Sequence, residues 1–245
     1  MNETLKQLHD RKSVRVYEDR AVEPEVKRAV LEAAVQAPTA GNMSLFTILD
    51  ITDPAIKAKL AVSCDNQPFI ATAPMVLIFC ADCLKWYEAY TSVGCTPRKP
   101  GAGDLLLAVN DALIAAQNAV VAAHSLGLGS CYIGDIVENY EFHKELLNLP
   151  KYVVPAAMLC IGYPTQHQLD RAKPVRFAVE DLVHENGYQP DKAAAMERML
   201  SGRNGRAGEA LADWVRRFCD FKWNSEFSRE MSRSCTEMVK DWCEE

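Results

Sequence analysis

A short cationic segment near the start of the chain has the residue types of an anion-binding site. Arg11, Lys12 and Arg15 place three cations within five residues, and Ser13 adds a hydroxyl between them. In an extended segment alternate side chains point to one face, so Arg11, Ser13 and Arg15 could bind one anion together. A solvated cluster of charges explains the same segment equally well, and these residues alone do not decide between the two.

Three other stretches carry groups that could contact a ligand. Arg171, Lys173 and Arg176 form a second group of cations, in a stretch with little periodicity. Residues 37–42 read Ala-Pro-Thr-Ala-Gly-Asn. A turn of small and polar residues that leads into a strand can lie against a ligand. Residues 82–103 combine aromatic side chains with glycines and prolines, which predicts a mobile or substrate-covering excursion in which regular structure fades.

The nine cysteines are odd in number, and most of them lie within apolar runs. In a reducing compartment such residues are most simply small core side chains. Cys80 and Cys83 have the Cys-x-x-Cys spacing of zinc and dithiol sites, but no second ligand pair stands at a comparable spacing. We therefore favour buried or semi-exposed thiols over a redox or metal function, and predict no metal site. His124, His143 and His167 are expected to be structural residues rather than bases.

The longest apolar stretch is predicted to form a helix on which much of the chain packs. Residues 105–126 carry their polar side chains in pairs seven positions apart, which form one narrow stripe on an otherwise apolar helix. Such a helix is buried, and at ~1.5 Å per residue it spans roughly 33 Å, so we expect a second subunit to help cover it. A membrane span is the rival interpretation, which the paired polar positions and the many alanines disfavour. A glycine-rich segment, residues 127–134, follows this helix.

Shorter helices and strands are expected along the rest of the chain. We predict strands at 45–51, 75–81, near Cys131 and at 156–161, and helices at 3–10, from Pro24 up to Pro38, at 54–60 and at 140–147. The order lacks strict βαβ alternation, so an α+β fold is favoured over a doubly wound sheet. From residue 191 the pattern is helical and polar, and the last helix has one apolar face. We therefore predict a domain of residues 1–190 and a helical C-terminal extension of residues 191–245, an arm that packs on this chain or on a partner.

The composition limits the classes of function. With 245 residues, of which 49% are hydrophobic and 24% charged, the chain is typical of a soluble globular protein. A net charge of -6 argues against a general nucleic-acid binder, although a local cationic site for a phosphate is compatible with it. Residues 1–14 have no apolar core, so we predict neither a signal peptide nor a membrane anchor. We expect a cytoplasmic location and no nucleic-acid or membrane partner.

Several motifs stand in one order along the chain. They are Arg-Lys-Ser-Val-Arg from residue 11, Ala-Pro-Thr-Ala-Gly-Asn from 37, Gln67, Gly-Leu-Gly-Ser-Cys-Tyr-Ile-Gly from 127, Leu-Pro at 149, Gly-Tyr-Pro at 162 and Lys-Pro-x-Arg at 173. No single motif is specific. Together, over about residues 5–188, they resemble the nitroreductase family of FMN-dependent NAD(P)H oxidoreductases. The resemblance implies an α+β fold with a mixed sheet flanked by helices, a long central helix at the interface of a homodimer, and two FMN sites between the subunits.

By this resemblance, the two cationic groups bind the FMN phosphate. Arg11 and Ser13 take it together with Lys173 and Arg176, because a phosphate dianion attracts guanidinium, ammonium and hydroxyl donors. Arg15 would stabilise the negative charge of reduced flavin at N1 and the adjacent carbonyl oxygen.

The contacts to the flavin ring are implied to come from the other motifs. Gln67 can donate and accept hydrogen bonds, which suits the pyrimidine edge. The backbone at Ile133 and Gly134 would lie beside flavin N5, where a glycine permits close approach. The other subunit would contribute the loop Pro38–Asn42. The expected cofactor-binding residues are Arg11, Lys12, Ser13, Arg15, Pro38, Thr39, Ala40, Gly41, Asn42, Gln67, Tyr132, Ile133, Gly134, Lys173 and Arg176.

The implied activity is hydride transfer from NADH or NADPH, through flavin N5, to a small electron-poor acceptor such as a nitroaromatic or a quinone, by a ping-pong mechanism. The flavin supplies the reactivity, so no catalytic side chain is assigned. One alternative is a specialised flavin reductase or oxidase of the same fold, with a pocket shaped by residues 86–90. Another is a non-catalytic flavin or thiol sensor, or a partner-binding protein, in which the C-terminal cysteines matter more than turnover. The sequence does not separate NADH from NADPH.

Overall fold

The computed structural model describes residues 1–189 and 193–244. The chain divides into two compact units, of which the first comprises Met1–Arg171 together with Glu230–Glu245 and the second comprises Ala172–Arg229. The boundary expected between residues 190 and 191 lies outside the described residues. The end of the chain therefore belongs to the same compact unit as its first 171 residues.

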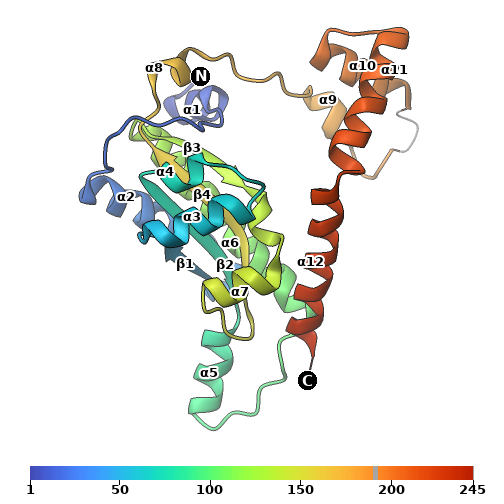
Figure 1. The fold of residues 1–245 in the computed structure, drawn as a ribbon. Helices are drawn as coiled ribbons and strands as arrows, with labels where there is room; N and C mark the ends of the chain where they lie inside the picture. The colour runs from blue at the N-terminus through green and yellow to red at the C-terminus, as the bar shows by residue number, and fades with distance from the viewer. Residues whose placement is uncertain (190–192, 245) are drawn as a thin grey trace. The chain divides into compact units, whose positions relative to one another are not determined.

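A four-stranded sheet forms the centre of the first unit (Figure 1). Its order is β1 (Phe46–Asp50), β2 (Met75–Asp82), β4 (Val153–Gly162) and β3 (Gly129–Ile133), and its three ladders are antiparallel. A parallel bridge joins Ser13 to Ser130 at the edge of β3 that does not face β4. Parallel and antiparallel pairing thus meet at β3, and the predicted α+β fold is confirmed.

Helices cover both faces of this sheet (Figure 1). On one face lie α3 (Pro54–Ser63) and α4 (Phe69–Thr72), and on the other lie α2 (Pro24–Val35) and α6 (Ala102–Ser125). β2 is buried along its whole length, because its even-numbered apolar side chains pack toward α3 and its odd-numbered ones toward α6. The strand reads as a continuous apolar run because neither of its faces meets water.

α6 has two different faces. Ala116 and Ala119 are fully buried against the sheet, where small side chains let the helix lie close to the strands. Leu106, Leu113 and Ile114 point away from the sheet, and Leu106 is 66% exposed. The helix is long and apolar enough to span a membrane by length and composition, but its buried face belongs to the core of the first unit. The predicted burial of this helix is therefore correct for the face that packs on the sheet. In a single chain, the opposite face is exposed to solvent.

The prediction that regular structure fades over residues 82–103 was wrong for the first half of that stretch. Leu84–Ser92 form α5, because glycine and proline interrupt the chain only from Gly94 onward. Trp86 and Tyr90 stand four positions apart, so their rings meet on one side of the helix with centroids 5.6 Å apart. Aromatic residues that suggested a loop are thus held at fixed positions on a helix.

The last helix ends in the first unit. In α12 (Glu226–Cys243), Ser234, Met238 and Trp242 follow each other at intervals of four and are buried. The Trp242 indole Nε1 donates a 3.1 Å hydrogen bond to the carbonyl oxygen of Gly101. In this half of the helix, the surface that the apolar face needs is therefore provided by the same chain.

The remaining elements are shorter. In the first unit they are α1 (Glu3–Asp10), α7 (Tyr140–Leu146), α8 (Gln166–Asp170) and the 3-10 turns η1 (Ala40–Asn42) and η2 (Gly134–Val137). In the second they are α9 (Val179–Leu182), α10 (Ala193–Asn204), α11 (Gly208–Phe218) and a π-helical turn, Cys219–Trp223.

Candidate functional site

The segment that carries the first three cations is extended and lies along the free edge of β3. The backbone N–H of Val14 donates a 3.0 Å hydrogen bond to the carbonyl oxygen of Ser130, next to the bridge from Ser13. Gly129 permits this approach, because a Cβ at that position would lie 2.6 Å from Cγ2 of Val14. A side chain at residue 129 would push the cationic segment off the sheet.

Alternate side chains of this segment gather around one thiol. Burial raises the pKa of Cys131, whereas the charges of Arg15 and Arg11 and a hydrogen bond with Ser13 lower it. All three predicted residues therefore act on the same point of β3. The structure brings Arg11, Ser13 and Arg15 together, as an extended segment requires.

The ammonium group of Lys12 has different partners. Nζ donates a 2.6 Å hydrogen bond to the carbonyl oxygen of Leu169, and another to that of Arg171. The buried side chain of Gln168 accepts a 3.2 Å hydrogen bond from the backbone N–H of Arg15. The region of α8 thus anchors the cationic segment, and Lys12 is bound to backbone carbonyls where the resemblance implied a cofactor contact.

One atom of the cationic group has no partner. The Nε of Arg11 is buried and forms no hydrogen bond within the described residues. A buried charged donor that stays unpaired costs about 1–3 kcal/mol or more. An anionic oxygen brought by a ligand would satisfy it, and Ser13, two residues further along the same segment, carries a hydroxyl that could turn to the same ligand. This arrangement fits a phosphate group.

At the other end of β3 the backbone is accessible. Gly134 is exposed, and no atom lies within 4 Å of the position that its Cβ would take. Gln67 lies next to this turn, because its Nε2 donates to Oδ2 of Asp135 over 2.6 Å and to the carbonyl oxygen of Cys64 over 2.9 Å. Both N–H groups of the amide are used in this way. Gln67 was expected to donate and to accept, and in this arrangement it offers Oε1 as an acceptor.

β3 sets the spacing between these two ends. Four residue steps from Ser130 to Gly134 correspond to about 13 Å in a strand. Ile133 is buried in the layer beneath α3, and the phenol of Tyr132 donates over 3.4 Å to Oε1 of Gln117 on α6. A ligand along the strand would therefore meet mainly backbone at these two residues. An elongated ligand with an anion at one end and a hydrogen-bonding ring at the other matches this strand.

The loop Pro38–Asn42 belongs to another part of the first unit. Asp111, buried on α6, accepts hydrogen bonds from the backbone N–H of Ala40 over 2.9 Å and of Leu45 over 3.1 Å. One buried carboxylate thus fixes the loop and the start of β1. Sequence reasoning missed this role of Asp111, and its signal was a polar residue in a stretch that is otherwise apolar.

The structure does not join this loop to the cationic segment within one chain. Among the described residues no hydrogen bond links Pro38–Asn42 to Arg11, Ser13, Gln67 or Gly134. Lys173 and Arg176 belong to the second compact unit. The implied contribution of the loop from another subunit stays a prediction.

The Cys-x-x-Cys pair consists of free, buried thiols. Burial raises the pKa of Cys80 to about 12 and that of Cys83 to about 11, with the carboxylate of Asp104 as the next cause at Cys83. Thiols that stay protonated exchange disulfides slowly. His143 is buried with partners on both ring nitrogens. The described residues contain no group of three or more histidine, cysteine, aspartate or glutamate side chains that could hold a metal ion.

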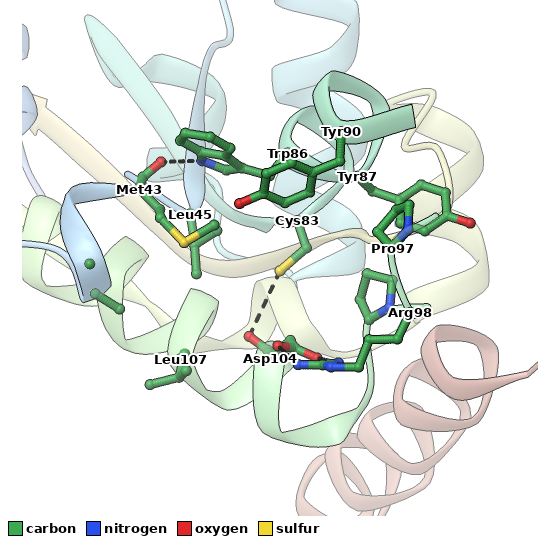
Figure 2. A pocket seen from close by; sticks show the side chains of 13 residues that line it. Met43, Leu45, Cys83, Trp86, Tyr87, Tyr90, Pro97, Arg98, Asp104 and Leu107 are labelled. Carbon is green, nitrogen blue, oxygen red and sulfur yellow. Dashed lines mark hydrogen bonds and ion pairs between the residues drawn. The ribbon is translucent and has the colours of Figure 1, made fainter. Parts of the chain in front are cut away.

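A pocket lies between the loop and α5 (Figure 2). Its volume is 510 Å³, and Ala40 and Gly41 line it together with the aromatic side chains of α5. We call it the aromatic pocket; its described lining also includes Met43, Leu45, Cys83, Pro97, Arg98, Pro100, Asp104 and Leu107.

Comparison with known proteins agrees with this architecture. The family model described as Nitroreductase family matches residues 8–163. The oxygen-insensitive NADPH nitroreductase of Salmonella typhimurium is 34% identical over 227 residues, which cover 89% of this chain and 91% of that protein. The FMN reductase (NAD(P)H) of Bacillus subtilis is 36% identical over 190 residues, with 77% and 75% covered. The structure of B. megaterium NfrA2 matches with a TM-score of 0.80 and 29% identity over 98% of both chains. The chain belongs to the nitroreductase family and is an oxidoreductase of that family.

Proposed function

We propose that this chain binds FMN and uses NADH or NADPH to reduce a small electron-poor acceptor, such as a nitroaromatic or a quinone. The observation that carries the proposal is the buried Nε of Arg11, an unpaired cationic donor beside Ser13 at one end of β3. An unpaired cationic donor favours an anionic ligand, and the phosphate of FMN is an anion of suitable charge. The Bacillus subtilis relative is named an FMN reductase, which supports FMN as the ligand.

The two ends of β3 would bind different parts of FMN, the phosphate at one end and the ring at the other. Arg11 and Ser13 hold the phosphate, and Lys173 and Arg176 are proposed to join them. Arg15 lies two residues beyond Ser13 in a segment that runs parallel to β3, toward Gly134, and is proposed to supply a cation that stabilises negative charge on the ring. When bound, FMN supplies the chemistry of accepting and donating a hydride at N5.

The ring would lie at the exposed end of the strand. Gln67 accepts a hydrogen bond from the pyrimidine edge through Oε1, since its N–H groups are already paired. Gly134 offers exposed backbone at the place proposed for N5. No side chain of the chain is assigned as an acid or a base.

The overall reaction balances without a further reactant. NAD(P)H and one proton from water convert a quinone to a hydroquinone and NAD(P)⁺. The nicotinamide and the acceptor would occupy the same open face at Gly134 in turn, which is the basis for a ping-pong mechanism. The chain's contribution is to hold the ring with one face accessible and to place cations near it.

A second copy of the chain is proposed to complete the site. Leu106, Leu113 and Ile114 form an exposed apolar face on α6, and such faces favour association. Pairing through α6 would also let the loop Pro38–Asn42, which hydrogen-bonds to Asp111 on α6, reach the flavin held by the other copy. A homodimer follows from this proposal. The cytoplasmic location and the separate extension of residues 191–245 stay predictions.

The colour, flavin content, activity and mass of the purified protein test the proposal. The protein should be yellow, release stoichiometric FMN on denaturation, and oxidise NADH or NADPH when menadione is added. Initial rates at several concentrations of both substrates should give parallel double-reciprocal lines, and light scattering should give the mass of a dimer. A colourless protein that takes up no added FMN would contradict the proposal.

A further inference from the structure

The orientation of the Gln67 amide depends on its two hydrogen-bond partners. Its Nε2 donates to the carbonyl oxygen of Cys64 over 2.9 Å and to Oδ2 of Asp135 over 2.6 Å. A side-chain amide that turns over about its last bond exchanges its donor for its acceptor. A carbonyl and an ionised carboxylate only accept hydrogen bonds, so a turned amide would bring Oε1 against two acceptors. The two partners therefore favour the orientation in which Oε1 is left for a ligand.

Backbone turns hold Gln67 and Asp135 opposite each other. Asp65 and Asn66 both have positive φ, 59° and 50°, and they turn the chain after α3. The backbone N–H of Gln67 then donates a 2.8 Å hydrogen bond to the carbonyl oxygen of Ala61. Asp135 lies in the 3-10 turn η2, directly after β3. Each residue thus belongs to a defined turn, and the contact between their side chains forms without a ligand.

The charge of Asp135 acts on the buried groups around Gln67. After burial, it is the next cause that raises the pKa of Cys64 to about 12 and that of Glu138 to about 7. A ring edge that contacts Oε1 of Gln67 would be held by the same amide and would meet the same charge. A negative charge near a cofactor ring makes the uptake of electrons by that ring less favourable.

The free Oε1 of Gln67 requires a donor on the ring. The pyrimidine edge of FMN presents one N–H, at N3, between two carbonyl oxygens, and Oε1 pairs only with the N–H. The oxidised ring is the more electron-poor of the two states, so its N–H is the stronger donor. An acceptor at N3 and a carboxylate behind it therefore both stabilise oxidised FMN relative to reduced FMN.

We propose that Asp135 is a positioning residue for the flavin ring and lowers its reduction potential. It holds the Gln67 amide with Oε1 toward N3–H, and its charge makes the bound flavin harder to reduce and a stronger reductant afterwards. Arg15 is proposed above to have the opposite effect, so the potential reflects the balance of the two charges. The inference rests on the proposed function, because it needs FMN beside Gln67.

The first measurement compares two flavins on the wild-type protein. 3-Methyl-FMN carries a methyl group in place of the N3 hydrogen and keeps the phosphate and both carbonyl oxygens. Its Kd should exceed that of FMN about 10-fold, because Oε1 of Gln67 loses its donor and stays unpaired. Equal affinities would show that Gln67 does not accept from N3, and would overturn the inference without the use of any variant.

The second measurement removes the charge of Asp135. In flavin-loaded Asp135→Asn, the Kd of reduced FMN divided by that of oxidised FMN should fall about 10-fold, which raises the potential by about 30 mV. The preference for FMN over 3-methyl-FMN should also shrink, because the new amide can donate to Oε1 and let Gln67 turn over. Asp135→Ser should behave in the same way, and Asp135→Glu, which keeps a carboxylate, should restore most of both values. Equilibration with a dye of known potential measures the shift.

Asp65→Asn is the matched control. It removes an exposed carboxylate from the turn before Gln67, and asparagine tolerates the positive φ of this position. Its potential and its flavin preference should equal those of wild type, since the charge of an exposed side chain is screened. An equal shift in Asp65→Asn, or wild-type values in flavin-loaded Asp135→Asn and Asp135→Ser, overturns the inference and leaves the proposed function standing. A wild-type protein that binds no FMN overturns the proposed function, and this inference with it.

Discussion

Buried ionisable atoms without a hydrogen-bond partner occur at Arg11 and at Glu138 in the part of the chain that the structure describes. Native proteins pair nearly all buried polar groups, so each unpaired atom marks a bound ligand or a loss of stability. Arg11 lies in a motif that sequence reasoning selected for its charge. Glu138 follows η2, close to Gly134, and no sequence pattern singled it out.

Replacing Arg11 should separate ligand binding from stability. Arg11→Met removes a charged donor that a phosphate would use, and such hydrogen bonds contribute about 1.5–3 kcal/mol. The Kd for FMN should therefore rise about 10- to 100-fold. The flavin-free protein should be no less stable than wild type, because the lost Nε has no partner in it. Fluorescence titration with FMN and thermal melting of the flavin-free protein check both parts, with the exposed Arg28→Met as the control. Unaltered FMN affinity would rule out Arg11 as a phosphate ligand.

Ionisation of the buried Glu138 side chain should lower the free energy of unfolding as the pH rises. The residue is 4% exposed, and burial, followed by the charges of Asp135 and Asp65, raises its pKa to about 7. Between its ordinary pKa and about 7, the folded protein holds a proton that the unfolded chain has released. The contribution of this proton to the free energy of unfolding is complete below the ordinary pKa of a glutamate side chain. It is lost as the pH rises past about 7.

Glu138→Gln removes this titration. At about pH 8 its Tm should exceed that of wild type by about 2–4 °C, the shift that 1 kcal/mol produces in a chain of this size. At about pH 5 the difference should shrink, because the wild-type carboxyl is then protonated in the folded state. Thermal melts across this pH range measure both values, and an equal gain at the two ends would show that another group is responsible.

At the scale of elements, Asp111 determines where the loop Pro38–Asn42 lies. Asp111→Asn keeps one carboxamide oxygen as an acceptor, so at most one of the N–H groups of Ala40 and Leu45 stays paired. We expect a loss of about 1–3 kcal/mol and faster hydrogen exchange at both amides. Exchange mass spectrometry of peptides around residue 40 measures this, with the exposed Asp19→Asn as control. If exchange there stayed at the wild-type rate, Asp111 would not be what holds the loop.

Some elements could be predicted from sequence because their signals are local. The long helix that became α6 follows from its apolar periodicity, and β2 follows from an unbroken apolar run. α5 could not be predicted in this way, because aromatic residues near glycines and prolines fit a loop as well as a helix. What fixes it is contact with distant parts of the chain, such as the 5.8 Å ring contact of Tyr87 with Tyr152.

At the scale of the whole molecule, the motifs indicated which residues meet at β3, but not how. Gly129 and Val14 are more than a hundred positions apart, and only the fold shows that the glycine makes room for the cationic segment. The separation of the loop from that segment could not be predicted from residue types either. It follows from the positions of α6 and β3, and a second copy of the chain is our proposed resolution.

The two faces of α6 provide a direct test of that proposal. Apolar character alone does not distinguish Ile114 from Ala116, but Ile114 is 41% exposed and Ala116 is fully buried. Ile114→Glu should give a folded monomer with wild-type far-ultraviolet circular dichroism and little bound FMN, because the charge lies at the proposed interface. Ala116→Glu should instead fail to fold, since an unpaired charge in the core costs several kcal/mol. Sedimentation, circular dichroism and flavin content, measured on both variants, distinguish the outcomes. An Ile114→Glu monomer that kept full FMN occupancy would show that one copy binds the cofactor alone, and a dimer would place the interface elsewhere.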